Sequence, residues 1–103
     1  MKKTFSIKLL DGDYSLHYDN IALYRFEELQ GDSVVMVMVN NRSSIRVITH
    51  FIWAGLLHEY PDITVSEVIK KINTEKLNEY VTVVSEAVNH AFGDSPKQAK
   101  KKV

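Results

Sequence analysis

Alternation of apolar and polar residues over positions 5–18 constrains the fold of this chain more than any other feature. Two runs place apolar side chains at every second position: Phe5, Ile7 and Leu9 in the first, and Tyr14, Leu16 and Tyr18 in the second. Between them, Asp11-Gly12 is the pair preferred in a two-residue type I′ turn, which would place Leu9 opposite Tyr14. The apolar side chains then share one face of a β-hairpin. Because an isolated hairpin is only marginally stable in water, this face must cover other elements.

The rest of the chain is predicted to be helical, with recognisable signals at the helix ends. From apolar spacing and capping residues we expect helices from Asp19 or Asn20 to Gln30, from about Ser43 to Glu59, from Val65 to Ile72 and from Asn73 or Thr74 to Gly93. The segment DSVVMVMVNN at 32–41 has two readings, since its run of Val and Met favours a buried strand while a short helix fits as well. The sequence therefore predicts an α+β fold, a hairpin followed by a bundle of four or five short helices, as a single domain over residues 1–93.

The junction FIWAGLLHEYPDITVSEV at 51–68 is punctuated by a proline and a capping box. Pro61 cannot continue a helix, so the preceding helix is expected to end near Glu59. Thr64 and Glu67 have the spacing of a capping box that starts the next helix, with Ile63 and Val68 in the staple positions. A glycine inside a helix costs about 1 kcal/mol relative to alanine, so Gly55 is expected to permit close approach by a neighbouring element.

The charge distribution argues against nucleic-acid binding by the folded part. Residues 1–96 carry nine positive and thirteen negative charges, a net of −4, and the remaining four lysines lie in a tail over 94–103 that we expect to be disordered. A helix-turn-helix over 65–92 would bring Glu75, Glu79 and Glu86 to DNA against a single Lys76, and phosphate repulsion disfavours it. No apolar stretch approaches the roughly 20 residues needed to cross a bilayer. Together with the absence of cysteine, these features lead us to expect a cytoplasmic protein that binds neither nucleic acid nor membrane.

No arrangement of residues indicates catalysis. The four histidines lack paired ligand spacing, since His50 and His58 are two turns apart on the expected helix and HEYPD lacks the second histidine of a zinc-protease motif. The four glycines are dispersed and cannot form a phosphate-binding loop. We therefore expect no enzyme activity, no cofactor and no metal site.

The order of these features resembles the small tail assembly chaperones of long-tailed bacteriophages and prophages, including related proteins of gene transfer agents. A hairpin is followed by a helix ending LYRFEELQGDS, then by ITHFIWAGLLHEYPDITVSEV, and last by a helix closing on VSEAVNHAFGDSP. The resemblance covers about residues 5–95. The matching positions are Phe26, Leu29, Gly31, Trp53, Ala54, Gly55, Leu56, Pro61, Thr64, Glu67, Val68, Ala87, Val88, Ala91, Phe92 and Gly93.

This resemblance implies a non-catalytic protein that binds the tape measure protein while the tail tube assembles around it and that is absent from the finished virion. Partner-binding candidates are the adaptable or aromatic side chains and the hairpin face: Met36, Met38, Trp53, Tyr14 and Leu16. Val34–Val39 itself is open to two interpretations, plain core or partner surface. A second function class also stays open, a small intracellular adaptor that binds a partner helix in an apolar groove.

The resemblance further implies a longer product made by a −1 ribosomal frameshift. Lys100–Lys102 must be encoded by an adenine-rich run, because lysine codons are AAA or AAG only, and a ribosome can slip on such a run. The extension would contact the major tail tube protein, while the body binds the tape measure protein at high effective concentration. A homo-oligomer is also compatible with the sequence.

Overall fold

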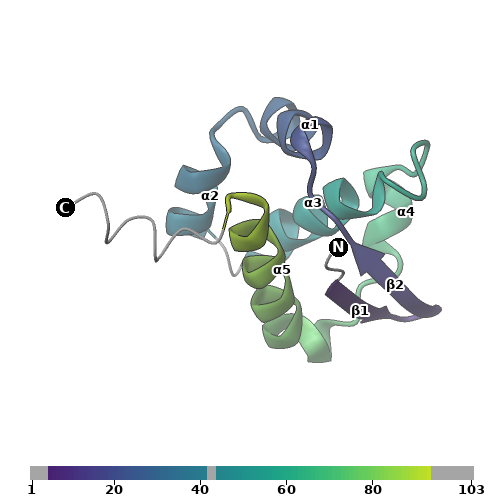
Figure 1. Cartoon of the computed structure of the whole chain (residues 1–103). Helices are drawn as coiled ribbons and strands as arrows, with labels where there is room; N and C mark the ends of the chain where they lie inside the picture. The colour runs from purple at the N-terminus through teal and green to yellow at the C-terminus, as the bar shows by residue number, and fades with distance from the viewer. Residues whose placement is uncertain (1–4, 42–43, 94–103) are drawn as a thin grey trace.

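A computed structural model describes residues 5–41 and 44–93, and these form an α+β fold (Figure 1). A two-stranded antiparallel hairpin comes first and is followed by five α-helices and one 3₁₀ turn. The elements are β1 (Phe5–Leu9), β2 (Gly12–Leu16), α1 (Asn20–Gln30), α2 (Val34–Asn41), α3 (Ile45–Leu56), α4 (Val65–Ile69), η1 (Thr74–Lys76) and α5 (Leu77–Ala91). The predicted fold class is confirmed. The expected basic tail over 94–103, with the lysine run, lies outside the described residues.

The hairpin forms with the expected face inward, but its register differs from the prediction by two residues. Leu9 lies opposite Gly12 and Ile7 opposite Tyr14, so the turn residues are Leu10 and Asp11. The predicted Asp11-Gly12 turn is therefore wrong. Because side chains alternate with a period of two, this shift leaves the same apolar residues on the inner face. Leu10, the one residue that breaks the alternation, is exposed at the turn.

Contacts from a distant part of the chain explain this register. The Leu10 N–H donates to the backbone oxygen of Lys71 at 2.8 Å, and the Lys71 ammonium pairs with the Asp11 carboxylate at 2.5 Å. The Tyr14 hydroxyl also donates to Asp11 at 2.9 Å. Gly12 has a φ of +146°, a conformation that L side chains rarely adopt, so it suits the position directly after the turn. Tertiary hydrogen bonds therefore override the preference for an Asp-Gly turn.

Helices α1 and α2 are separated by residues 31–33, and most of the segment at 32–41, for which the sequence allowed a strand or a helix, is helical. Of the two capping candidates, Asp19 caps α1 by accepting from the Ala22 N–H, and Gly31 ends the helix in the left-handed conformation. Residues Val34–Asn41 form α2, so the strand alternative is wrong. β-branched propensity is a weak preference, and here no neighbouring strand in the described chain offers these residues a ladder of hydrogen bonds.

Helix α3 lies at the centre of the molecule, between the hairpin and the other helices (Figure 1). Nine of its twelve residues are buried. A Cβ on Gly55 would lie 2.9 Å from Leu16 Cδ2 and 3.0 Å from the Tyr18 ring, so the predicted close approach is confirmed. The helix ends at Leu56, three residues before the predicted Glu59, because the Glu59 and Tyr60 N–H groups both turn back to the Leu56 oxygen.

The C-terminal part carries the expected capping residues and ties the chain back to the hairpin. The capping box between Thr64 and Glu67 is present, although α4 ends at Ile69 and is three residues shorter than predicted. Asn73 caps the turn before α5. The buried Tyr80 hydroxyl accepts from the Asn73 N–H and donates to the backbone oxygen of Lys8 at 3.0 Å. No helix in the described residues is both long and apolar enough to span a bilayer.

Candidate partner-binding surface

The structure divides the five predicted partner-binding residues into buried and accessible ones. Leu16 is completely buried against α3, and Trp53 is 8% exposed. Tyr14 is half-buried, with its ring edge-on to Tyr60 and its hydroxyl bonded to Asp11. Met38 is also half-buried, and Met36 is 46% exposed. The five residues therefore do not form one surface, and a partner that docks on this conformation cannot reach Leu16 or Trp53.

Trp53 is held inward by specific contacts. Its indole N–H donates to the backbone oxygen of Ile63 at 2.9 Å, which ties α3 to the loop before α4. The Arg25 guanidinium lies 5.5 Å from the ring centroid and covers it from α1. A buried tryptophan usually finds a partner for its N–H in this way, and here the partner is structural. Trp53 is thus a packing residue that fixes the junction after α3.

The accessible apolar surface lies on α2. Val34 and Val37 face the core, while Val35, Met36 and Val39 are 58%, 46% and 72% exposed. The helix VVMVMVNN carries no charged residue at all. A helix on the surface of a protein normally presents polar side chains to water, so this exposed face is unusual. Contiguous exposed apolar surface is a common feature of interaction sites.

Two hydrogen bonds at the N-terminus of α2 fix the position of this helix. The Val34 N–H donates to the Glu27 carboxylate of α1 at 2.8 Å, and the Met36 N–H donates to the Ser33 hydroxyl at 3.2 Å. These bonds satisfy two of the N–H groups that a helix start leaves without intrahelical partners. Together with burial of Val34 and Val37, they hold the outer face of α2 toward solvent.

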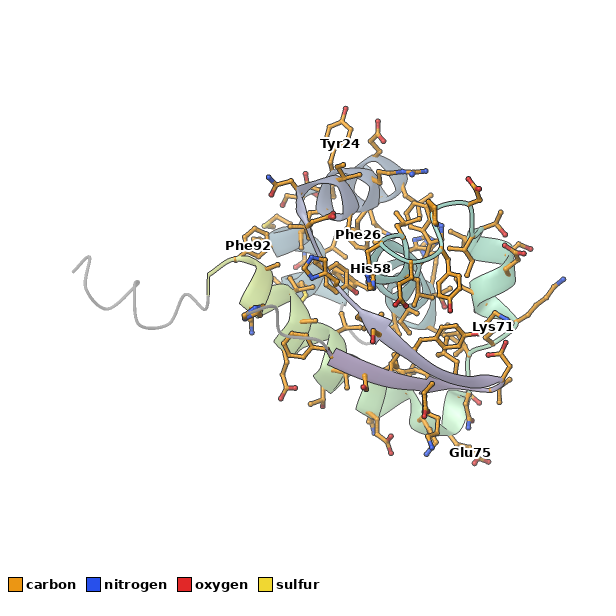
Figure 2. All side chains as sticks on the ribbon, turned by 45° about the vertical axis from the view of Figure 1, so that its right-hand side comes forward. Tyr24, Phe26, His58, Lys71, Glu75 and Phe92 are labelled. Carbon is orange, nitrogen blue, oxygen red and sulfur yellow. The ribbon has the colours of Figure 1, made fainter. Side chains whose placement is uncertain are left out.

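A groove runs between α2 and the end of α5. It has a volume of about 220 Å³ and is lined by Val34, Val35, Met38 and Val39 of α2 and by Val88 and Phe92 at the end of α5. Phe92 is 46% exposed, and Figure 2 shows it at the C-terminal end of α5, directed away from the hairpin. Asn89 is the polar residue of the lining. The groove is apolar, uncharged and open to solvent.

The sequence identified Met36 and Met38 as candidates and left Val34–Val39 open between core and partner surface, but it did not indicate Phe92 as a partner-binding residue. An uninterrupted run of Val and Met has no polar positions, so it does not indicate which side faces the core. Phe92 directly follows the apolar series of α5, so the spacing alone does not separate it from the buried face of that helix. Only the relative placement of α2 and α5 reveals that Val35, Val39 and Phe92 share one surface.

The histidines are spread over the structure. His17 and His58 meet edge-on with ring centroids 5.5 Å apart, His90 lies 5.7 Å from the Phe5 ring, and His50 contacts the Gln30 side-chain amide. Burial and the nearby Arg46 lower the pKa of His50, so this side chain stays neutral at pH 7. Among the described residues, no three His, Cys, Asp or Glu side chains gather as metal ligands would.

Comparisons of the chain with models of protein families, with curated proteins and with solved structures find no significant match. The functional argument therefore depends on the residues and on their arrangement in this fold.

Proposed function

We propose that this protein is a tail assembly chaperone of a bacteriophage or prophage and that it binds the tape measure protein through the α2 face and the α2–α5 groove. The observation that carries the proposal is the uncharged helix α2, with three large apolar side chains exposed beside the groove. An apolar groove of this kind suits one face of an amphipathic helix. The resemblance described above supplies the identity of the client, and the proposal places the protein in the cytoplasm of a bacterial host.

The size of the surface favours several copies on one client. Helix α2 has eight residues and is therefore about 12 Å long, which matches about two turns of a client helix. A tape measure protein is long and largely helical, so one copy would cover only a small part of it. Methionine side chains adapt to different apolar neighbours, and Met36 and Met38 would allow one surface to bind successive, non-identical segments.

The test is co-expression with the tape measure protein encoded near the same gene, followed by pull-down. Wild-type protein should keep the client soluble and be recovered with it. The double variant Val35→Asp/Val39→Asp places two charges on the exposed face and should lower the recovered client by about tenfold or more, since desolvating a charge against an apolar partner is costly. Both positions are exposed, so the variant should retain the wild-type melting temperature.

Ile21→Asp is the matched control. Ile21 is an exposed apolar residue on a different helix, 67% accessible on α1, and lies outside the groove. This variant should bind the client as wild type does. If the tape measure protein is equally insoluble with and without the wild-type protein, the chaperone proposal fails. A different helical partner that is lost on Val35→Asp/Val39→Asp would then favour the adaptor function.

A further inference from the structure

A second surface site lies at the other end of the molecule from α2, where the loop after α3 meets the hairpin and α4 (Figure 1). It is an open pocket of about 490 Å³. Its lining combines two tyrosines, two aliphatic side chains and three carboxylates with one lysine. The proposed chaperone function makes no use of this pocket.

The tyrosines and aliphatic residues give the pocket an amphipathic interior. Tyr14 of β2 and Tyr60 of the loop meet edge-on, with ring centroids 5.8 Å apart and ring planes at 66°. Tyr60 is 44% exposed, so part of its ring is available to a ligand. Pro61 and Ile63 supply apolar surface beside the rings. Aromatic faces carry negative electrostatic potential and attract cations, while aliphatic walls suit the methylene stem of a long side chain.

The charge of the pocket is negative, because its one lysine is already compensated. Lys71 pairs with Asp11 at 2.5 Å, and this contact raises the pKa of Lys71 and lowers the pKa of Asp11, so both stay charged at neutral pH. The side chain of Lys71 lies beside the hairpin turn in Figure 2. The Asp11–Lys71 ion pair therefore contributes no net charge to the site.

The three carboxylates of the lining, Glu59, Asp62 and Glu67, determine the sign of the pocket's net charge. Within the described residues, Glu59 and Asp62 form neither an ion pair nor a side-chain hydrogen bond. Glu67 uses one carboxylate oxygen, Oε1, to accept from the Thr64 N–H and hydroxyl in the capping box. The lining thus has unpaired acceptors and an exposed aromatic ring, and an anionic ligand would be repelled.

We propose that this pocket binds an arginine or lysine side chain presented by a peptide segment of a partner protein. The methylene stem would pack on Pro61 and Ile63, and the cationic group would lie between the Tyr60 ring and the carboxylates of Glu59 and Asp62. Charge complementarity identifies the occupant: the pocket supplies acceptors and a ring face, and a cationic side chain supplies donors and positive charge. The pocket shares no residue with the α2–α5 groove. One copy of the protein could therefore bind a client at α2 and a basic peptide segment at this pocket at the same time.

The indole N–H of Trp53 can report on binding at this pocket in an NMR spectrum. Trp53 is the only tryptophan, and its indole N–H donates to the backbone oxygen of Ile63, a residue that lines the pocket. Occupation of the pocket should therefore shift the single indole signal in a ¹H–¹⁵N spectrum. The probe is the blocked peptide acetyl-Ala-Leu-Arg-Leu-Ala-amide, and its controls are the same peptide with lysine, with citrulline and with glutamate in place of arginine.

The arginine peptide should shift the indole signal saturably, and the citrulline peptide, which has nearly the same shape without the charge, should bind at least about tenfold more weakly. The lysine peptide should bind, and the glutamate peptide should not. Glu59→Gln/Asp62→Asn should lower affinity for the arginine peptide by a similar factor without changing the melting temperature, because both side chains are exposed. Glu86→Gln, an exposed carboxylate of α5 outside the pocket, should leave affinity unchanged.

Two results would overturn the proposal. Equal shifts with the arginine and citrulline peptides would show that charge does not select the ligand. Full binding by Glu59→Gln/Asp62→Asn would show that the peptide binds elsewhere. Neither result bears on the tape measure pull-down, which depends on α2, so failure of this proposal and failure of the chaperone function are distinguishable.

Discussion

At Gly55 the hairpin and the central helix approach so closely that no space is left for a side chain. A Gly55→Ala methyl would lie 2.9 Å from Leu16 Cδ2 and 3.0 Å from the Tyr18 ring, and both neighbours are buried. Overpacking costs typically 1–3 kcal/mol, and the better helix propensity of alanine returns about 1 kcal/mol. We expect Gly55→Ala to lower the free energy of unfolding by about 1 kcal/mol, measured by urea denaturation.

A double-mutant cycle with Leu16→Ala tests whether overpacking causes the lower stability of Gly55→Ala. Leu16→Ala removes the methyl group that a Cβ at position 55 would meet, so the two substitutions should be less than additive in the free energy of unfolding. Strict additivity would mean that Gly55 and Leu16 are not in contact in solution.

The buried Tyr18 hydroxyl should make the stability of the protein fall with rising pH in the alkaline range. This hydroxyl donates to the Phe51 oxygen at 2.5 Å, and burial raises the pKa of Tyr18 far above its usual value near 10. Above about pH 10 the unfolded chain loses this proton while the folded chain keeps it, so stability is present below that pH and is lost as the pH rises. We expect an additional loss of about 1 kcal/mol per pH unit above pH 10.

Tyr18→Phe should remove this pH-dependent contribution. At neutral pH the variant loses one buried hydrogen bond and should be less stable than wild type by about 1 kcal/mol. Thermal melts of both proteins between pH 8 and pH 11 provide the comparison. Parallel stability profiles for the two proteins would contradict the assignment, since Tyr14, lysines and other groups titrate equally in both.

Among the elements, α4 depends most on its cap. It has only five residues, and its capping box supplies three hydrogen bonds between Thr64 and Glu67 at 2.9–3.2 Å. Thr64→Ala should lower the free energy of unfolding by about 1 kcal/mol. Ser66→Ala, an exposed position in the same helix, is the control and should have little effect. Equal losses in both variants would show that the helix depends on propensity and not on its cap.

Local signals explain which elements could be predicted from sequence. The caps at Asp19, Thr64 and Asn73 depend on residues two or three positions apart. The sequence alone therefore predicts the cap at Thr64, and it limits the other two to Asp19 or Asn20 and to Asn73 or Thr74. The hairpin register depends on a bond from Leu10 to Lys71, sixty-one positions away, and turn preference alone gives the wrong pairing. The α2 segment was ambiguous because propensity favoured a strand, while the placement of Val34 and Val37 against the core decided for a helix.

Within residues 5–41 and 44–93, the buried hydrophobic side chains form one cluster, to which β1, β2 and every α-helix contribute. Leu56 of α3 is fully buried and Val84 of α5 nearly so. Leu56→Asp or Val84→Asp would bury an unpaired charge, at a cost of several kcal/mol that is comparable to the total stability of a small domain. Both variants should lose cooperative thermal unfolding, measured by circular dichroism.

Val39→Asp is the matched control for this experiment. It introduces the same charge at a valine that is 72% exposed, so its melting curve should stay close to that of wild type. A cooperative, near-wild-type melt of Leu56→Asp would show that the position of the central helix is wrong.

The sequence predicted the candidate binding sites only in part, because they depend on how the whole molecule folds. The alternation of β1 and β2 identified which hairpin residues point inward, and for that reason Leu16 is unavailable to a partner. Trp53 was expected at the surface, yet its N–H is satisfied by Ile63 and its ring is covered by Arg25, contacts that no local pattern specifies. The α2–α5 groove and the Tyr60 pocket both arise from elements far apart in the chain.

The bond between Tyr80 and the Lys8 carbonyl has a consequence for synthesis on the ribosome. The hairpin leaves the ribosome before α5, and Tyr80, whose hydroxyl donates to the Lys8 oxygen, comes seventy-two positions later. The apolar face of β1 and β2 therefore stays uncovered until α3 and α5 have been synthesised. Nascent chains arrested before Tyr80 should remain sensitive to protease, and protection should appear only once α5 has left the exit tunnel.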